Sequence, residues 1–152
     1  MKNRHYTYRF IFVPETIGSI AYISKNFDQM KKNIIAGFNL SCIGDEREYS
    51  YISSRSGNTI ADQIAKKILF SIDKKFKKYS WLERGSDERQ FCSPGVDLPI
   101  CTISRSKFGK YKEYHNSLDI IGKVVTKNGM NSSLTLLKKI INFLKNTFYY
   151  NS

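Results

Sequence analysis

Cysteine is scarce in this sequence, which has 3 cysteines among 152 residues. Cys42, Cys92 and Cys101 are too few and too scattered for a disulfide framework or a CxxC metal knuckle, so we expect free thiols and a cytoplasmic protein. Long apolar runs are also missing, and without about 18 consecutive apolar residues we expect no spanning helix and no membrane partner. The first residues hold only a short apolar stretch, Phe10 to Val13, without the long apolar region or cleavage site of a secretory signal.

Acidic residues are also few: the sequence has 13 Asp and Glu and 25 Lys and Arg, which gives a net charge of +12. The excess is spread along the chain: residues 1–76 hold 12 basic and 7 acidic residues, and residues 77–152 hold 13 and 6. No recognition helix or nucleic-acid motif accompanies it. We therefore expect a solvated basic surface with weak, nonspecific attraction to polyanions and no specific nucleic-acid partner. The one tight basic run is Lys74, Lys75, Lys77 and Lys78.

Apolar and β-branched runs alternate with helical spacing along the chain, which predicts a single α/β domain with a mostly parallel sheet. The segment from Gly44 to Tyr51 is polar and rich in carboxylates, and residues 85–94 form a polar loop or first helical turn. A further loop, rich in Gly, Tyr and charge, is expected at 107–119. Buried or short strands are predicted at 6–13, 34–44, 78–82 and 98–104, and helices at 16–26, at 60–72 and in the last segment.

Two helices have the clearest patterns. Isoleucines recur every four residues from Ile60 to Ile72, and Thr59 followed by Asp62 forms a capping-box-like pair at its start. The C-terminal helix is predicted to begin with Ser132 or Ser133 as its cap. Its apolar stripe is expected to comprise Leu134, Leu137, Ile140, Ile141, Leu144 and Phe148.

Polar clusters fall at the ends of the predicted strands. In an open α/β sheet the carboxyl ends of parallel strands lie on one edge, so these clusters would converge there. Carboxylates with one histidine are ligand types that zinc accepts, and a free carboxylate nearby would serve as a general base. The alternative is that these are solvated loop carboxylates beside a surface histidine. The clusters are Glu15, Asp45 with Glu46, Asp87 with Glu88, and His115 with Asp119.

Four segments together resemble a known family. The strings RFIFVPETIGSIAY, NLSCIGDEREYSY, RGSDERQFCSPGVDLP and SKFGKYKEYHNSLD are similar to the bacterial aminopeptidase-like family of polysaccharide-biosynthesis gene clusters, a distant branch of the zinc-dependent aminopeptidases. They follow in the same order from about Arg4 to Asp119. The resemblance implies a partial phosphorylase/hydrolase-like fold and metal-dependent hydrolysis of a peptide or amide bond at a free amino terminus, with a peptide-like or aminoacyl substrate.

The resemblance assigns roles to residues in the first two segments. The paired Glu-Glu-x-Gly of the zinc aminopeptidases corresponds to Glu15-Thr16-Ile17-Gly18, which makes Glu15 the counterpart of the general base. Thr16 then occupies a metal-ligand position that it cannot fill as a carboxylate would. Ser41 stands where the family has an aspartate ligand, and Asp45 is the nearest substitute.

The other two segments supply the rest of the implied site. Ser86-Asp87 resembles a loop that shapes the family's site without binding metal. His115 corresponds to the family's last metal ligand, and Asp119 would support it from behind. The implied metal set in this chain is therefore His115 and Asp45, with Glu15 as base and Asp87 and Asp119 in support.

The family's first ligands come from a segment that would precede residue 1, and its C-terminal DNA-binding-like domain would follow residue 152. We therefore expect 1–152 to be an internal piece of a longer protein, with weak or absent zinc binding and little activity of its own. Its expected partner is the missing half of a split protein or a second copy. The alternatives are a noncatalytic interaction module or remnant of a split gene and, third, a nonspecific polyanion binder.

Overall fold

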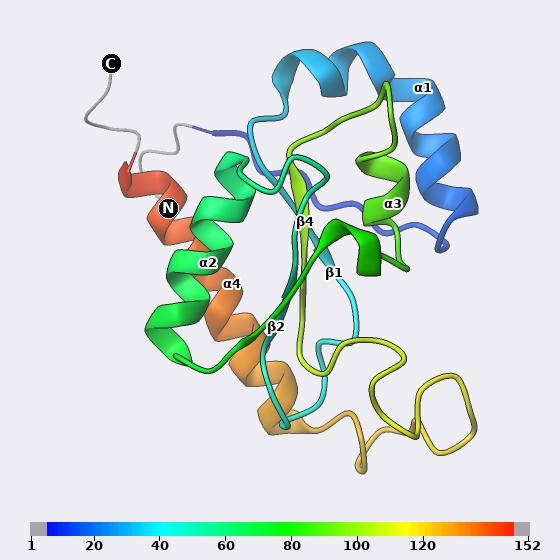
Figure 1. The fold of residues 1–152 in the computed structure, drawn as a ribbon, viewed down its shortest axis with the longest axis vertical. Coiled ribbons are helices and arrows are strands. Elements are labelled where there is room, and N and C mark those ends of the chain that lie inside the picture. Colours follow the sequence, from blue (N-terminus) through cyan, green and yellow to red (C-terminus); the bar gives the residue numbers. More distant parts are fainter. Residues whose placement is uncertain (1–5, 148–152) are drawn as a thin grey trace.

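The computed structural model describes residues 6–147, which form a four-stranded mixed sheet with helices on both faces (Figure 1). The sheet order is β1-β4-β2-β3, with β1 and β4 parallel, β2 and β3 parallel, and β2 antiparallel to β4. The predicted α/β class with a mostly parallel sheet is therefore confirmed. The strands are β1 (Gly37–Leu40), β2 (Ser50–Ile52), β3 (Lys77–Tyr79) and β4 (Ile100–Ser104).

Two helix pairs cover the two faces of the sheet. Helix α2 (Ile60–Ile72) packs with α4 (Lys127–Thr147) in one apolar cluster, and α1 (Ile17–Asn33) packs with the short α3 (Glu88–Phe91) in a second cluster. Figure 1 shows the pairs on opposite sides of the strands. A 3-10 turn, η1 (Trp81–Glu83), follows β3. Within the described residues, none of the helices has the length and apolarity required to cross a membrane.

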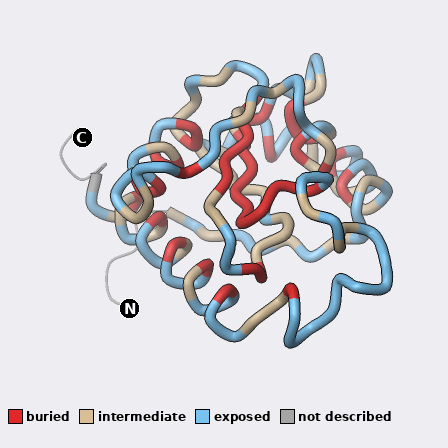
Figure 2. The backbone as a smooth tube through the Cα atoms, turned by 60° about the horizontal axis from the view of Figure 1, so that its bottom comes forward, coloured by how far each residue is buried: buried red, intermediate tan, exposed pale blue. Residues whose placement is uncertain are grey.

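Strand β4 is buried along its whole length because both of its faces are covered. Cys101 and Ile103 belong to the cluster of α2 and α4, whereas Ile100 belongs to that of α1 and α3. Figure 2 shows the buried residues gathered in the sheet and on the inner sides of the helices. The loop after β4 therefore starts from the centre of the core, whereas β1 ends at the half-exposed Leu40.

Helix α2 has the predicted bounds and the predicted cap. The Thr59 side chain accepts a hydrogen bond from the Asp62 backbone N–H, and the Asp62 carboxylate accepts one from the Thr59 backbone N–H at 2.7 Å. Asp62 is fully buried and also accepts hydrogen bonds from the Tyr51 hydroxyl and the Ser54 backbone. Burial would raise the pKa of Asp62, but the hydrogen bonds from Ser54, Thr59 and Tyr51 outweigh that effect and lower it.

The predicted buried strand at 6–13 is wrong. Residues 7–14 run extended but belong to no strand, and Phe10 and Phe12 are 73% and 93% exposed. An apolar run becomes a buried strand only when a neighbouring strand and a covering layer exist, and no described strand pairs with this segment. The predicted strand at 34–44 shortens for a related reason to β1, an edge strand that pairs only with β4.

Three other boundaries differ from the predictions. Helix α1 continues to Asn33, and the predicted strand at 78–82 divides into β3 and η1. Strand β2 lies at the end of the segment predicted to be a polar loop, where its three residues are all buried. The strand predicted at 98–104 is confirmed as β4, and residues 107–119 form the predicted loop.

Helix α4 begins earlier than its expected serine cap. The Thr126 side chain accepts a hydrogen bond from the Gly129 backbone N–H at 2.9 Å, and this is the bond that an N-cap residue makes. The longer helix is also rotated relative to the predicted stripe, so that Leu136 is buried and Leu134 is half exposed. Ile140 and Leu144 are buried as predicted, and Phe148 lies outside the described residues.

Candidate functional site

Glu15 lies in the exposed turn that begins α1. The turn is held by Asp87, whose Oδ1 accepts hydrogen bonds from the Thr16 backbone N–H at 2.8 Å and from the Ser19 hydroxyl at 2.7 Å. Thr16 has a positive φ of 64°, a conformation that a non-glycine residue adopts only when its surroundings impose it. Asp87 therefore fixes the backbone beside Glu15, and its supporting role in catalysis stays a prediction.

His115 lies in the loop that follows β4 and is exposed. Its ring stacks on that of Tyr114, with centroids 3.9 Å apart and an interplanar angle of 16°, and its φ is 58°. Tyr114 in turn meets the ring of Tyr111 edge-on at 5.7 Å. Stacking on Tyr114, which itself contacts Tyr111, orients the exposed ring of His115. The two tyrosines are three residues apart in the sequence.

Tyr114 gives an indirect link between Glu15 and His115. Burial, followed by the electrostatic effects of Cys42 and of Glu15, raises the pKa of the Tyr114 hydroxyl. Tyr114 therefore interacts electrostatically with Glu15, and its ring stacks on the ring of His115. Among the described contacts none joins Glu15 to His115 directly, so their convergence stays a prediction that this electrostatic link supports.

Asp45 is buried and its carboxylate is fully engaged in the protein. Its Oδ1 accepts hydrogen bonds from the Arg47 backbone N–H and the Ser106 hydroxyl, both at 2.9 Å. Its Oδ2 accepts one from the Ser106 backbone N–H at 2.8 Å. These bonds join the loop after β1 to the loop after β4, and they use the oxygens that a metal would need.

Asp119 is exposed and lies against Tyr111, whose hydroxyl is 3.2 Å from Asp119 Oδ2 and 3.5 Å from Cys42 Sγ. Burial, then the hydrogen bond to Cys42, raises the pKa of Tyr111 well above its usual range. Tyr111 therefore connects the loop at 107–119 to Cys42, the residue that follows Ser41, and Asp119 contacts the same hydroxyl. The hydroxyl of Ser41 lies 3.7 Å from Cys42 Sγ.

The donor set does not fit a catalytic zinc by itself. Such a zinc takes about three protein ligands and keeps a further position open for water or substrate. In residues 6–147 no three His, Cys, Asp or Glu side chains gather as a metal cage. Thr16, at one ligand position, accepts a hydrogen bond from Arg89 Nη2 at 3.1 Å, and Asp45 is bound to Ser106.

Glu88 is a buried anchor whose function the sequence did not predict. Its Oε1 accepts hydrogen bonds from the Gly85 and Ser86 backbone N–H groups at 2.7 and 3.0 Å. Its Oε2 accepts from Asn39 Nδ2 and the Thr102 hydroxyl, both at 2.9 Å. Glu88 thus joins α3 to β1 and β4. The only sequence signal was a Ser-Asp-Glu string before the apolar Phe91, which is typical of a helix start.

Comparison with known proteins gives the family. The family described as a domain of unknown function, DUF4910, matches residues 1–147. A Clostridium acetobutylicum protein, named for polysaccharide biosynthesis with an aminopeptidase-like domain, is 37% identical over 145 residues, which are 95% of this chain and 33% of that protein. The chain therefore spans about a third of the length of this relative.

Solved structures show the same relationship. A Clostridium acetobutylicum crystal structure, named as a peptidase, aligns with a TM-score of 0.81 at 34% identity over 88% of this chain and 31% of that one. An aminopeptidase from Aneurinibacillus sp. strain AM-1 aligns with a TM-score of 0.63 at 16% identity, over 85% and 30% of the two chains, and shares the fold. The resemblance to aminopeptidase-like proteins is thereby confirmed, and this chain belongs to the DUF4910 family.

Proposed function

We propose that this chain is one part of a metal-dependent aminopeptidase-like hydrolase, to which it contributes Glu15 as general base and His115 as a metal ligand. The observation that carries the proposal is that Tyr114, whose ring stacks on His115, is also within electrostatic range of Glu15. The relatives named for an aminopeptidase-like domain support this chemistry, and the expected substrate is a peptide or aminoacyl compound with a free amino terminus. The remaining ligands come from outside these residues.

Glu15 is suited to the role of base. It is exposed in the turn before α1, and no described residue forms a hydrogen bond with its carboxylate. A carboxylate in this position can take a proton from an attacking water and pass it to the leaving amine. The hydrogen bond that the Thr16 backbone N–H donates to Asp87 would hold the backbone beside Glu15 in place during that transfer.

The proposal includes weak metal binding by the chain alone, because Asp45 and Thr16 are engaged with Ser106 and Arg89. Zinc titration by calorimetry should give an affinity weaker than micromolar, and an aminoacyl-anilide assay should give no turnover above that of Glu15→Gln. His115→Gln should remove the residual zinc binding, whereas Asp28→Asn, which changes an exposed carboxylate on α1, should leave it unchanged. Tight zinc binding with Glu15-dependent turnover would show that the site is complete, and residual binding unaffected by His115→Gln would reject His115 as a ligand.

A second candidate function is that of an interaction module formed by residues 7–14. Phe10 and Phe12 are strongly exposed, while Ile11 between them and Val13 after them are half-buried, which is the alternation of a strand. No described backbone hydrogen bond involves residues 7–13, so their N–H and C=O groups are available to another strand. We propose that this segment pairs with a strand of another chain, and a second copy is the partner tested first.

Light scattering after size exclusion tests this pairing. The wild-type chain should self-associate as its concentration rises, and Phe12→Glu should shift it toward monomer. The matched control is Leu82→Glu, which changes another strongly exposed apolar side chain outside the segment. A chain that stays monomeric at every concentration, or that responds equally to both substitutions, would rule out self-pairing through residues 7–14.

A further inference from the structure

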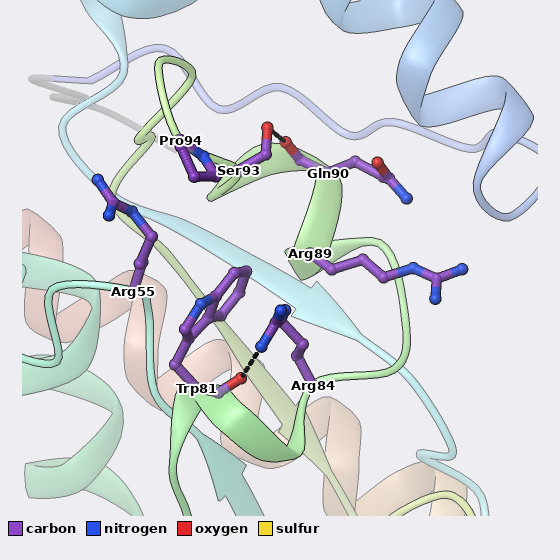
Figure 3. A pocket seen from close by; sticks show the side chains of 7 residues that line it. All are labelled: Arg55, Trp81, Arg84, Arg89, Gln90, Ser93 and Pro94. Carbon is purple, nitrogen blue, oxygen red and sulfur yellow. Dashed lines mark hydrogen bonds between the residues drawn. The ribbon is translucent and has the colours of Figure 1, made fainter.

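A surface cavity of about 580 Å³, largely open to solvent, carries three arginines and the sole tryptophan of the chain (Figure 3). It opens between the loop after β2, the turn η1 and helix α3 with the residues that follow it. Its lining contains three arginines and no Asp or Glu, although Asp97 outside the lining pairs with Arg55. The lining residues are Arg55, Trp81, Arg84, Arg89, Gln90, Ser93 and Pro94.

Trp81 is held in place from its own turn. The Ser80 backbone N–H donates to the Glu83 carboxylate, which completes a capping box around η1. Arg84 lies 4.6 Å from the centroid of the Trp81 ring and donates from Nη1 to the Trp81 carbonyl oxygen at 3.2 Å. In Figure 3 the indole lies between Arg55 and Arg84. A flat aromatic surface is therefore flanked by two guanidinium groups.

Arg89 differs from the other two arginines. It points away from the indole in Figure 3, and its Nη2 donates to the Thr16 hydroxyl at 3.1 Å. Arg55 forms an ion pair with Asp97, which lies outside this cavity lining, and this hydrogen bond lowers the pKa of Asp97. Arg84 has no acidic partner among the described ion pairs. Arg84 and Arg55 are thus the groups that can meet a ligand, with Arg55 partly neutralised.

We propose that this cavity binds a small anion that carries a ring, with its phosphate or carboxylate bound by the guanidinium groups of Arg55 and Arg84 and its ring against the face of Trp81 that Arg84 does not cover. Guanidinium groups bind phosphate and carboxylate oxygens in pairs, and an indole face stacks on flat or apolar ring faces. A volume of about 580 Å³ is large enough to hold such a ligand, which would remain partly exposed to solvent. A nucleoside phosphate and an acidic sugar share this chemistry, because each combines a ring with an anionic group.

Tryptophan fluorescence tests this directly, because every photon from tryptophan comes from Trp81. Uridine monophosphate, glucuronate and inorganic phosphate are titrated into the full chain. We expect a saturable change with uridine monophosphate or glucuronate, weaker binding of inorganic phosphate, and about tenfold weaker binding in Arg55→Gln and in Arg84→Gln. The stronger of the two ring compounds identifies the ligand class. Arg47→Gln, which removes an arginine outside the cavity, should bind as the wild type does.

Absence of a saturable change with all three probes would overturn the proposal, as would equal weakening in Arg47→Gln. Binding of inorganic phosphate as tight as that of the ring compounds would remove the role of Trp81. A further variant, Asp97→Asn, releases Arg55 from its ion pair, and asparagine tolerates the positive φ of 44° at this position. We expect several-fold tighter binding, and unchanged or weaker binding would exclude Arg55 as the ligand's partner.

Discussion

At the scale of single residues, buried carboxylates organise the loops of this protein. Asp45, Asp62 and Glu88 are all buried, and each accepts hydrogen bonds from backbone N–H groups of a loop. A charge removed from water must be paired or hydrogen-bonded, so each carboxylate gathers donors around itself. The sequence shows where carboxylates lie, but whether a carboxylate is solvated, metal-binding or buried depends on which distant loop it meets.

Asp62→Asn should destabilise the chain by about 3 kcal/mol at pH 7, because the amide turns one acceptor into a donor facing buried donors. The lowered pKa of Asp62 adds a pH dependence. Its stabilising effect is present above the unfolded-state pKa of about 3.9 and is lost as the pH falls through the folded-state pKa. Urea unfolding should therefore show a smaller difference between wild type and variant at about pH 2.5. Asp28→Asn, an exposed change, should show neither effect, and a difference that does not vary with pH would contradict the assignment.

Asp87→Ala should loosen the first turn of α1 by about 1–2 kcal/mol, since it removes the acceptor for the Thr16 N–H and the Ser19 hydroxyl. Hydrogen exchange at the Thr16 amide should become faster while exchange in α2 stays unchanged. Asp87→Asn keeps an acceptor oxygen at the same place and should retain most of the protection. Equal loss in both variants would mean that the charge of Asp87, and not its hydrogen bonds, holds the turn.

At the scale of elements, success in prediction depended on how local the determining contacts are. Helix α2 was predicted correctly because its isoleucine spacing lies within its own thirteen residues and its capping residue, Thr59, directly precedes them. Residues 6–13 have equally apolar character, yet a strand needs a partner that the segment itself does not specify. The helix start at Thr126 was missed because Ser132 and Ser133 are also good caps, and the choice is made by packing against residues 44 and 45.

Gly129 shows that packing. A Cβ at this position would overlap the Gly44 carbonyl oxygen and the backbone of Asp45, so the first turn of α4 approaches the loop after β1 at backbone distance. Helix propensity alone predicts that Gly129→Ala would stabilise a helix by about 1 kcal/mol. We expect the opposite sign, a loss of about 2 kcal/mol or more in thermal or urea unfolding, because the helix must move away from the loop. Asn142→Ala, at an exposed position of α4, is the control and should be neutral or stabilising, and a stabilised Gly129→Ala would show that the contact yields easily.

At the scale of the whole molecule, the net charge of +12 destabilises the folded state, because its many basic side chains repel one another. The described ion pairs are those of Arg47 with Glu113 and of Arg55 with Asp97, both at least partly exposed. Exposed pairs contribute about 0–1 kcal/mol each, so they offset little of it. The charge is spread over the sequence and predicts attraction to any polyanion, whereas the cavity around Trp81 predicts selectivity for one kind of small anion.

The effect of general charge and the effect of the cavity can be separated by comparing NaCl with the ring compounds at equal ionic strength. Raising NaCl from about 20 to 300 mM should raise the melting temperature by a few degrees, because screening weakens the repulsion. The double variant Lys74→Gln with Lys75→Gln removes two exposed charges from the basic run and should respond less to NaCl. At equal ionic strength, uridine monophosphate or glucuronate should stabilise the wild type beyond NaCl, since a bound ligand adds its own free energy. That excess should disappear in Arg84→Gln but persist in the lysine variant, and an excess lost equally in both would assign it to general charge and not to the cavity.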